Sequence, residues 1–503
     1  MQNSLNLNKR IVNYLIKMKK YFIYKWACNS ILMGFFLIGL QACQENKTPA
    51  IDSLPVGKLK AYVEQIGPDF SYEIMDTLHY EQAAVYHIKM FSGRWLTEAV
   101  VDKPLWWHWV DVVVPKETDT KNALLFIGGG SQKDTKVFVD SMAIAQAIKT
   151  KSIVAHVSNV PFQPLSFKGS DSIARYEDNI IAYGWDQFLS GGAKAEDLEW
   201  LARFPMTRAA VRAMDVVEAL AQEVEKPVTS FFVLGASKRG WTTWTTAAVD
   251  DRVMGMAPLV IDMLNLVPSF DHHHKVYGQW SPAVQNYVDQ NIMDWMGSKE
   301  FDRLLDFIEP YEFKSLFTLP KLIVNGTIDE FFVTDSWQFY WDDLPGPKFL
   351  QYVPNGNHGL AGRYSTQNIF SFYESLIHQK PLPKLDWRIE GDRIVVKVDP
   401  AASYEISLWE AHNPKARDFR IWEIGRSWQK TPLQQQASGN YEIDIPLKEG
   451  FTAALVEVVF NGDTAFPLTL TTGTVIRPNE FAFKPYQPEH PKGTYAEQQH
   501  KTE

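Results

Sequence analysis

Cysteine is almost absent from this chain of 503 residues, which contains only Cys28 and Cys43. Both lie in an N-terminal segment that has the pattern of an export signal, described below. If that segment is cleaved before Cys43, Cys28 is lost and the mature chain has no pair of cysteines for a disulfide. Folding must then depend on the hydrophobic core, which a chain of this length is able to bury.

The chain also lacks an excess of positive charge. It has 50 Lys and Arg residues against 59 Asp and Glu residues, for a formal net charge of -9. No long basic tract follows the N-terminal segment, and phosphate binding requires a basic face, so nucleic acid is excluded as a partner. The apolar share of 45% and the charged share of 22% are ordinary for a globular protein and exclude wholesale disorder. There is no internal repeat.

The apolar stretch near the N-terminus is short. Residues 31–40 follow four lysines within residues 17–25, and ten apolar residues are too few to span a bilayer. This pattern predicts a signal peptide over residues 1–42, with Met18 as an alternative start.

The end of the signal resembles a bacterial lipobox, in the sequence Leu40-Gln41-Ala42-Cys43. A lipobox predicts that Cys43 is lipidated and that the polar residues after it serve as a tether, over residues 43–55. We therefore expect a lipid-anchored protein of the bacterial cell envelope, in the periplasm or at the outer membrane. A plain signal peptide and free secretion, with Cys43 incidental, is the alternative.

Alternating strand and helix patterns occupy residues 106–353. Short apolar runs predict strands at 106–114, 123–127, 152–157, 230–234, 256–261, 321–324 and 349–353. Pro115 favours a position at the sheet edge for the first of them. Helical patterns at 137–150, 207–225 and 241–248 lie between them. The alternation predicts an α/β fold, in which a doubly wound, mostly parallel sheet carries helices on both faces.

A serine stands where one of these strands meets a helix. The hexapeptide Gly235-Ala236-Ser237-Lys238-Arg239-Gly240 follows the apolar run 231–234 and opens a helical stretch. This is the pattern of the nucleophile elbow of α/β-hydrolases, in which glycines permit a strained turn. The spacing is G-x-S-x-x-G, because Arg239 occupies the usual position of the second glycine. Ser237 is therefore the candidate nucleophile.

A serine nucleophile needs a base and an orienting acid, which follow it in this fold in the order acid, then histidine. Asp329 comes directly after the strand 321–324, and His358 follows the strand 349–353. The 29 residues between them, from 329 to 358, accommodate one helix and one strand. Asp262, after the strand 256–261, and Asp335 are alternative acids.

The candidate oxyanion hole combines the backbone N–H of Lys238 with a donor from the glycines that follow the strand 123–127. Among them Gly129 and Gly130 are the expected donors. The Lys238 ammonium would suit a substrate that carries a carboxylate, and a solvated surface lysine is the alternative.

The chain has 17 tryptophans, which are typical both of clefts that hold sugars or peptides and of a large core. Trp185 and Trp241 are candidates for the wall of the substrate site, with packing as the alternative. His272-His273-His274 are adjacent in sequence and cannot all face one ion, so we expect a polar loop or cap edge and no metal site. We expect no cofactor.

The domain organisation follows from changes in pattern along the chain. An α/β-hydrolase domain is expected over residues 56–383, with a helical cap inserted at about 264–320. After Pro381-Leu382-Pro383, short alternating runs predict a second, all-β domain of immunoglobulin-like type at 384–484. The polar residues 485–503 predict a disordered tail.

The chain resembles the PhoPQ-activated pathogenicity-related protein family over roughly residues 50–480. Five segments carry the resemblance: 200–209 (WLARFPMTRA), 235–241 (GASKRGW), 329–332 (DEFF), 357–358 (NH) and 416–420 (ARDFR). The basic residue after the serine is also similar to the elbow of glucuronoyl and other carbohydrate esterases. The resemblance implies an α/β-hydrolase fold and a secreted or envelope location, but it supplies no substrate.

These patterns together predict a serine hydrolase that cleaves an ester or amide bond through an acyl-enzyme, with Ser237, His358 and Asp329 as the triad. The expected substrate is a small molecule, a glycan or a peptide, and the sequence leaves open whether the enzyme is an esterase or a peptidase. The alternative is a surface binding protein that retains the hydrolase fold without catalysis.

Overall fold

The computed structural model describes residues 54–494, apart from residues 136–140, 172, 361–363 and 447. The expected signal peptide, the lipidation site at Cys43 and nearly all of the expected tether lie outside the described residues. Within the part of the chain that the structure describes, no helix has the length and apolar character needed to cross a membrane.

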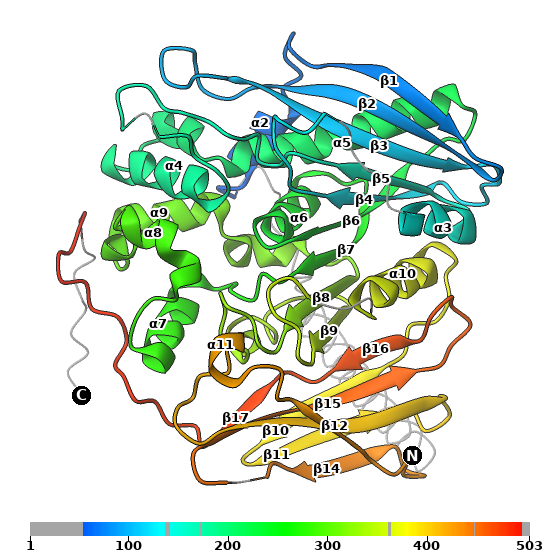
Figure 1. Cartoon of the computed structure of the whole chain (residues 1–503), viewed down its shortest axis with the longest axis vertical. Coiled ribbons are helices and arrows are strands. Elements are labelled where there is room, and N and C mark those ends of the chain that lie inside the picture. Colours follow the sequence, from blue (N-terminus) through cyan, green and yellow to red (C-terminus); the bar gives the residue numbers. More distant parts are fainter. Residues whose placement is uncertain (1–53, 136–140, 172, 361–363, 447, 495–503) are drawn as a thin grey trace, which may run out of the picture. The chain divides into compact units, whose positions relative to one another are not determined.

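A nine-stranded, mixed and mostly parallel sheet forms the centre of the larger domain (Figure 1). Its order is β1-β2-β3-β5-β4-β6-β7-β8-β9, in which β4 to β9 run parallel and β1 to β3 pair antiparallel. The strands are β1 (Ser71–His79), β2 (Ala83–Arg94), β3 (Leu105–Pro115), β4 (Asn122–Ile127), β5 (Ile153–Val157), β6 (Ser230–Ala236), β7 (Val253–Leu259), β8 (Lys321–Gly326) and β9 (Lys348–Val353).

The prediction of an edge position for the strand at 106–114 was wrong. β3 lies between β2 and β5, and β1 forms the edge instead. β1 and β2 were not predicted from the sequence. β1 is exposed along nearly its whole length, and its polar residues conceal the strand pattern. Pro115 is tolerated because it is the last residue of β3.

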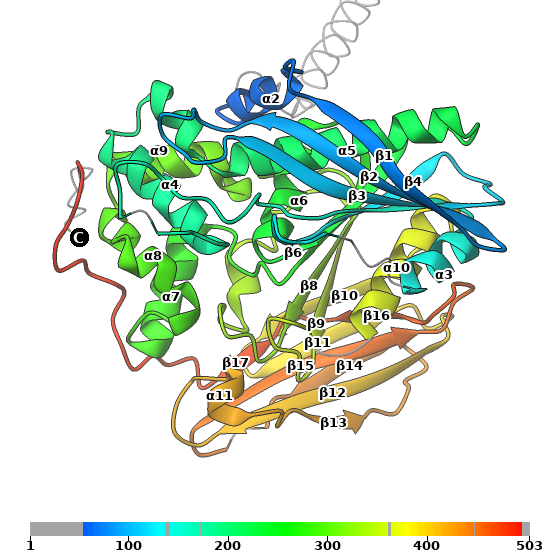
Figure 2. The same ribbon diagram turned by 45° about the horizontal axis from the view of Figure 1, so that its top comes forward.

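Helices cover both faces of this sheet (Figure 2). α2 (Gly57–Glu64), α5 (Arg203–Glu223) and α6 (Lys238–Val249) pack on one face, and α3 (Ser141–Thr150) and α10 (Tyr364–Ile377) pack on the other. Successive side chains of a strand point to opposite faces, so Leu125 joins the first hydrophobic core and Leu124 the second. Burial on both faces explains the continuous apolar runs of the central strands.

Helical segments also lie near the carboxyl ends of the parallel strands. Between β7 and β8 the chain forms α7 (Leu266–Tyr277), η3 (Pro282–Val284), α8 (Gln285–Asp289), η4 (Ile292–Trp295), α9 (Lys299–Ile308) and η5 (Pro310–Leu316). Earlier in the chain, α4 (Asp178–Ser190) and η2 (Ala195–Trp200) precede α5, and η6 (Ser336–Phe339) follows β8. α9 begins where the Ser298 hydroxyl accepts a hydrogen bond from the Phe301 N–H at 3.1 Å, and its apolar face is buried.

The C-terminal part of the chain forms antiparallel β-sheets. One contains β10 (Leu385–Glu390), β11 (Arg393–Val398) and β14 (Asn440–Asp444); the other contains β12 (Tyr404–Asn413), β13 (Gln429–Pro432), β15 (Phe451–Phe460), β16 (Leu468–Thr471) and β17 (Val475–Arg477). A short helix, α11 (Ile421–Ile424), follows β12. These sheets contact the larger domain beside β9, where the Tyr352 N–H donates to the Thr471 hydroxyl at 2.8 Å.

The first part of the expected disordered tail makes defined contacts. The Tyr486 hydroxyl donates to Asp294 at 2.8 Å, and the Thr494 N–H donates to Glu300 at 2.8 Å. Residues 485–494 therefore differ from the expectation, because an aromatic ring and backbone donors find partners along the helical segment. Residues 495–503 lie outside the described part of the chain.

Candidate active site

Ser237 occupies the sharp turn between β6 and α6. Its backbone has φ 57° and ψ -125°, a conformation that is rare for a residue with a side chain. A Cβ at Gly235 would lie 2.6 Å from the Arg239 carbonyl oxygen, and a Cβ at Gly240 would lie 2.8 Å from the Leu259 carbonyl oxygen. The G-x-S-x-x-G spacing thus places both glycines where backbone approaches closely, and Gly240 meets this requirement one position later than usual.

Asp329 and His358 lie side by side at the carboxyl ends of β8 and β9. The His358 Nδ1 atom is 2.9 Å from Oδ2 and 3.1 Å from Oδ1 of Asp329. Asp329 is buried, and its Oδ1 also accepts the Phe331 N–H at 2.7 Å. The neighbouring carboxylate of Glu330 accepts the backbone N–H of His358 at 2.8 Å, which fixes the loop that carries the imidazole. The geometry is that of an acid orienting a histidine.

The second nitrogen of the imidazole, His358 Nε2, is buried and has no partner in the described part of the chain. The Phe331 ring centroid lies 4.0 Å from that of the imidazole. The cavity beside Ser237 has a volume of only about 30 Å³, enough for a water molecule and too small for an acyl substrate. Substrate entry therefore requires side chains around this cavity to move.

Neither rival acid approaches His358 as Asp329 does. Asp262 is fully buried and accepts hydrogen bonds from the hydroxyls of Tyr340, at 2.7 Å, and Tyr352. Burial raises the pKa of Asp262 to about 8, so this carboxyl is protonated near neutral pH. Asp335 lies 2.7 Å from His272 Nε2 and pairs with the Arg417 guanidinium.

The three adjacent histidines lie on helix α7, within the expected cap segment, and not on a polar loop. Each finds a different partner: His272 pairs with Asp335, His273 accepts the Ser281 N–H at 3.0 Å, and His274 contacts the Lys484 carbonyl at 3.0 Å. Burial lowers the pKa of His273 to about 3, so it is neutral. Among the described residues no cluster of three or more His, Cys, Asp and Glu side chains has a geometry for a metal ion.

The candidate oxyanion loop follows β4. Gly130 has φ +142°, and its carbonyl accepts the Gln163 side-chain N–H at 2.6 Å. A Cβ at Gly129 would lie 2.9 Å from the Arg239 guanidinium, so glycine permits close packing at this position. Lys238 begins α6, with its backbone N–H at the helix N-terminus, where a developing oxyanion is stabilised.

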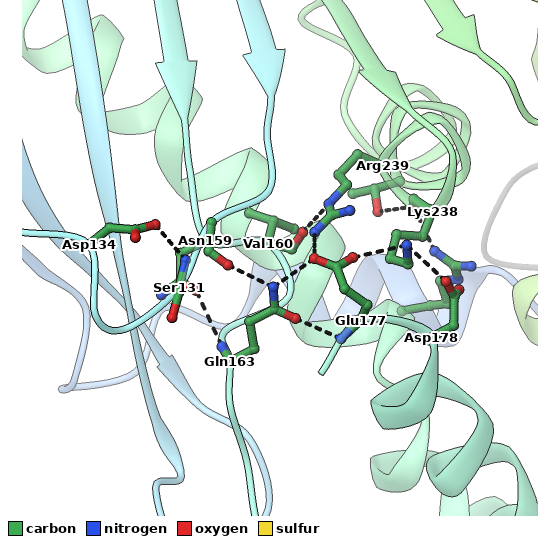
Figure 3. Close-up of polar contacts among 12 residues, drawn as sticks. Ser131, Asp134, Asn159, Val160, Gln163, Glu177, Asp178, Lys238 and Arg239 are labelled. Carbon is green, nitrogen blue, oxygen red and sulfur yellow. Dashed lines mark hydrogen bonds and ion pairs between the residues drawn. The ribbon is translucent and has the colours of Figure 1, made fainter. Parts of the chain in front are cut away.

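The Lys238 side chain is neither solvated nor free for a substrate carboxylate. Its ammonium is buried and lies 2.9 Å from both Glu177 Oε2 and Asp178 Oδ2 (Figure 3). Two carboxylates already neutralise this charge. The suggestion that Lys238 binds a substrate carboxylate therefore has no support from the geometry.

Glu177 is the central residue that the sequence analysis missed. Its Oε1 accepts from Arg239 and from Gln163, each at 2.6 Å, and its backbone has φ 53° and ψ -127° (Figure 3). Although burial acts in the opposite direction, the Arg239 hydrogen bond and the Lys238 and Arg239 charges lower the pKa of Glu177 to about 2. Glu177 thus connects the two residues after Ser237 to the glycine loop. In the sequence, only the acidic pair before a helix marks it.

Both predicted cleft tryptophans line the small cavity beside Ser237. Trp241 donates its Nε1–H to the Ile308 carbonyl at 2.6 Å, and the Arg203 guanidinium lies 4.5 Å from the Trp241 ring. The Trp185 ring packs 5.2 Å from the Tyr287 ring. Each tryptophan is therefore both a packing residue and part of the cavity wall.

Comparison with known proteins gives relatives over most of the chain. The profile of the PhoPQ-activated pathogenicity-related protein family matches residues 59–420. Autocrine proliferation repressor protein A of Dictyostelium discoideum is 31% identical over 455 residues, which cover 84% of this chain and 91% of that protein.

Solved structures are more distant. An acetyl xylan esterase from Paenibacillus sp. R4 is 13% identical, covers 66% of this chain and 96% of its own, and has a TM-score of 0.45. A glucuronoyl esterase from Solibacter usitatus is 11% identical, covers 64% and 91%, and has a TM-score of 0.38. The profile match and the identity to the Dictyostelium protein both extend over most of the chain, and the chain belongs to the PhoPQ-activated pathogenicity-related protein family.

Proposed function

We propose that this protein is a serine hydrolase that cleaves an ester or amide bond through an acyl-enzyme intermediate. The observation that carries the proposal is the hydrogen bond of 2.9 Å between Asp329 and His358 Nδ1. The buried Nε2 has no partner among the described residues, and His358 lines the same cavity as Ala236, the residue before the strained turn of Ser237. A hydrogen-bonded acid fixes the imidazole tautomer in which Nε2 is able to accept a proton.

The reaction has two halves. The Ser237 Oγ attacks the acyl carbon while His358 Nε2 takes its proton, and the same proton is then given to the leaving alcohol or amine as its bond to the acyl carbon breaks. Water then attacks the acyl carbon while His358 Nε2 takes a proton from it, and this proton passes to Ser237 Oγ as the bond between Oγ and the acyl carbon breaks and the acid is released. The Lys238 N–H and the Gly129 and Gly130 loop stabilise the oxyanion in both halves. These steps use only side chains and backbone of this chain, and no cofactor.

A fluorophosphonate probe tests this proposal, because it reacts covalently with an activated serine. We expect labelling of the wild-type protein that is lost in Ser237→Ala. Ser190→Ala is the matched control, since Ser190 is exposed and its hydroxyl hydrogen-bonds within its own helix, to Asp186 at 3.3 Å. Absence of labelling in folded wild-type protein would refute the proposal that this protein is a serine hydrolase.

A second candidate is a binding protein that retains the hydrolase fold without catalysis. The small volume of the cavity beside Ser237, about 30 Å³, favours it, because no acyl group fits in that cavity. The two candidates differ in the labelling experiment: the binding protein leaves Ser237 unreactive in folded protein.

Two further proposals concern the location of the protein and its C-terminal domain. We propose that Cys43 is lipidated and anchors the protein to the bacterial cell envelope, with free secretion as the alternative. Incorporation of a radiolabelled fatty acid that is lost in Cys43→Ala would support the anchor, and its absence in the wild type would refute it. We further propose that the antiparallel sheets at 384–484 form an immunoglobulin-like domain.

A further inference from the structure

A second and much larger cavity lies on the other face of the sheet. Its volume is about 580 Å³, which is within the range of sites for small organic ligands. Its floor is formed by β3 to β7, and its walls by α3 and α10, which lie side by side in both ribbon views (Figures 1 and 2). Most of its lining is aliphatic or aromatic, so an apolar ligand gains free energy on entering it.

One end of this cavity reaches the candidate active site. His358, Gly359 and Leu360 contribute to its lining, as does Ala236, the residue before Ser237. The imidazole therefore borders the large cavity, while Ser237 borders the small cavity on the side of the helical segment. A ligand in the large cavity has its near end beside the proposed catalytic base.

The other end of the cavity is polar. Asp111 on β3 is in register with His87 on β2 and with His156 on β5. One carboxylate oxygen of Asp111 is 2.5 Å from His87 Nδ1, and the other, Oδ2, is buried with no partner in the described structure. Asp111 is only 3% exposed. A buried acceptor without a donor is costly and indicates a place for a ligand group that donates a hydrogen bond.

The distance between the two ends follows from the sheet. β3 and β6 are separated by β5 and β4, so three strand spacings of about 4.8 Å give roughly 14 Å from Asp111 to Leu234, which is in register with it, and Ala236 lies two residues further along β6. Phe126 on β4 lies between the two ends, and Leu234 precedes Ala236 on β6; both line the cavity and make this length apolar. Burial lowers the pKa of the neighbouring His156 to about 4, so the polar end carries a neutral imidazole near pH 7.

We propose that this cavity binds the acyl group of the substrate, as an apolar chain or ring that carries a hydroxyl at its far end, where Asp111 accepts its hydrogen bond. The proposal rests on the proposed function, because the acyl carbon must reach Ser237. The acyl group is the preferred occupant because it stays covalently attached between the two halves of the reaction, whereas the leaving group departs after the first.

Direct binding tests the cavity without requiring catalysis. We expect octanoate to bind the Ser237→Ala protein in isothermal titration calorimetry, and 8-hydroxyoctanoate to bind about five- to tenfold more tightly through the hydrogen bond to Asp111. Ala143→Phe, which fills the cavity from α3, should abolish binding of both acids. Ala145→Phe is the matched control, because Ala145 is exposed on the same helix and does not line the cavity.

Kinetics on a series of esters then test whether the cavity binds the acyl group of the substrate. In protein with intact Ser237, Ala143→Phe should lower kcat/KM for octanoyl esters at least tenfold and leave acetyl esters unchanged, while Ala145→Phe changes neither. If Ala143→Phe does not fold, Thr366→Phe fills the cavity from α10, with Gln367→Phe as its control.

The outcomes separate this inference from the proposed function. The inference is overturned if octanoate does not bind folded Ser237→Ala, even if the fluorophosphonate labels Ser237. It is also overturned if the variants that fill the cavity show the same dependence of kcat/KM on acyl-chain length as the wild type. A loss of kcat/KM that depends on the length of the alcohol group, and not on that of the acyl chain, also overturns the inference. Equal affinity for the two acids overturns the role of Asp111. Octanoate binding without any labelling of Ser237 refutes both the proposed function and the acyl role.

Discussion

Replacement of Asp329 by asparagine is the sharpest test of the proposed triad. The Asp329 Oδ1 atom accepts the Phe331 N–H at 2.7 Å, so in Asp329→Asn this position must remain an oxygen. The amide NH₂ group then takes the place of Oδ2, 2.9 Å from His358 Nδ1. Because an NH₂ group cannot accept a hydrogen bond, the shorter of the two contacts of Nδ1 then favours Nδ1 as the acceptor, with the proton on Nε2. The imidazole is then unable to take the proton of Ser237.

A base held in the wrong tautomer should cost a factor of about 10⁴ in kcat, equivalent to roughly 5.4 kcal/mol of transition-state stabilisation. The assay is hydrolysis of p-nitrophenyl acetate, with protein concentration corrected by circular dichroism for the folded fraction. Because the substitution is isosteric, we expect the folded structure to be retained.

Asp262→Asn is the matched control for this experiment. Asp262 is already protonated near neutral pH and is held by two tyrosine hydroxyls, so a neutral amide replaces it with little change in charge. We expect its kcat to stay within about threefold of the wild type, about 0.7 kcal/mol. A loss at Asp329→Asn of less than tenfold, or a larger loss at Asp262→Asn, would refute the assignment of the acid.

Three further predictions concern stability and access. Burial raises the pKa of Asp262 in the folded state, so the stability that this carboxyl contributes is complete below about pH 4 and is lost as pH rises through about 8. Urea unfolding should show this decline in the free energy of unfolding for the wild type and not for Asp262→Asn. Glu177→Gln removes the negative charge between Lys238 and Arg239. Because Glu177 is partly exposed, we expect the free energy of unfolding in urea to fall by only about 1–2 kcal/mol. An unchanged midpoint of unfolding would show that Glu177 does not stabilise this turn. Phe331→Ala should enlarge the closed cavity and speed labelling by a bulky alkyl fluorophosphonate more than by a small one, and equal rates would show that Phe331 does not limit access.

Local patterns were sufficient to predict much of the fold and the candidate residues of the site. The apolar runs of β4 to β9 are continuous because both faces are buried, and Ser237, Asp329 and His358 each follow such a run. The carboxyl ends of parallel strands share one edge of a sheet, so their order along the chain implies proximity. β1 was missed because its exposed face carries polar residues, which remove the apolar signal.

The identity of the partners within the site was decided only by tertiary structure. From the sequence, Asp329, Asp262 and Asp335 were all eligible as the acid. Burial keeps Asp262 neutral although the hydrogen bonds from Tyr340 and Tyr352 act in the opposite direction, and Arg417, from the segment after β12, holds Asp335. Those contacts join residues far apart in the sequence, so no local sequence pattern predicts them.

The sequence by itself determined the alternation of buried strands and helices, and the glycines that Ser237 requires, because both depend on neighbouring residues. Tertiary structure alone decided that Lys238 is neutralised by Glu177 and Asp178, that the cavity beside Ser237 is small, and that a large apolar cavity borders His358. Ion pairs and cavities depend on which side chains meet across the fold, and that is a property of packing in three dimensions.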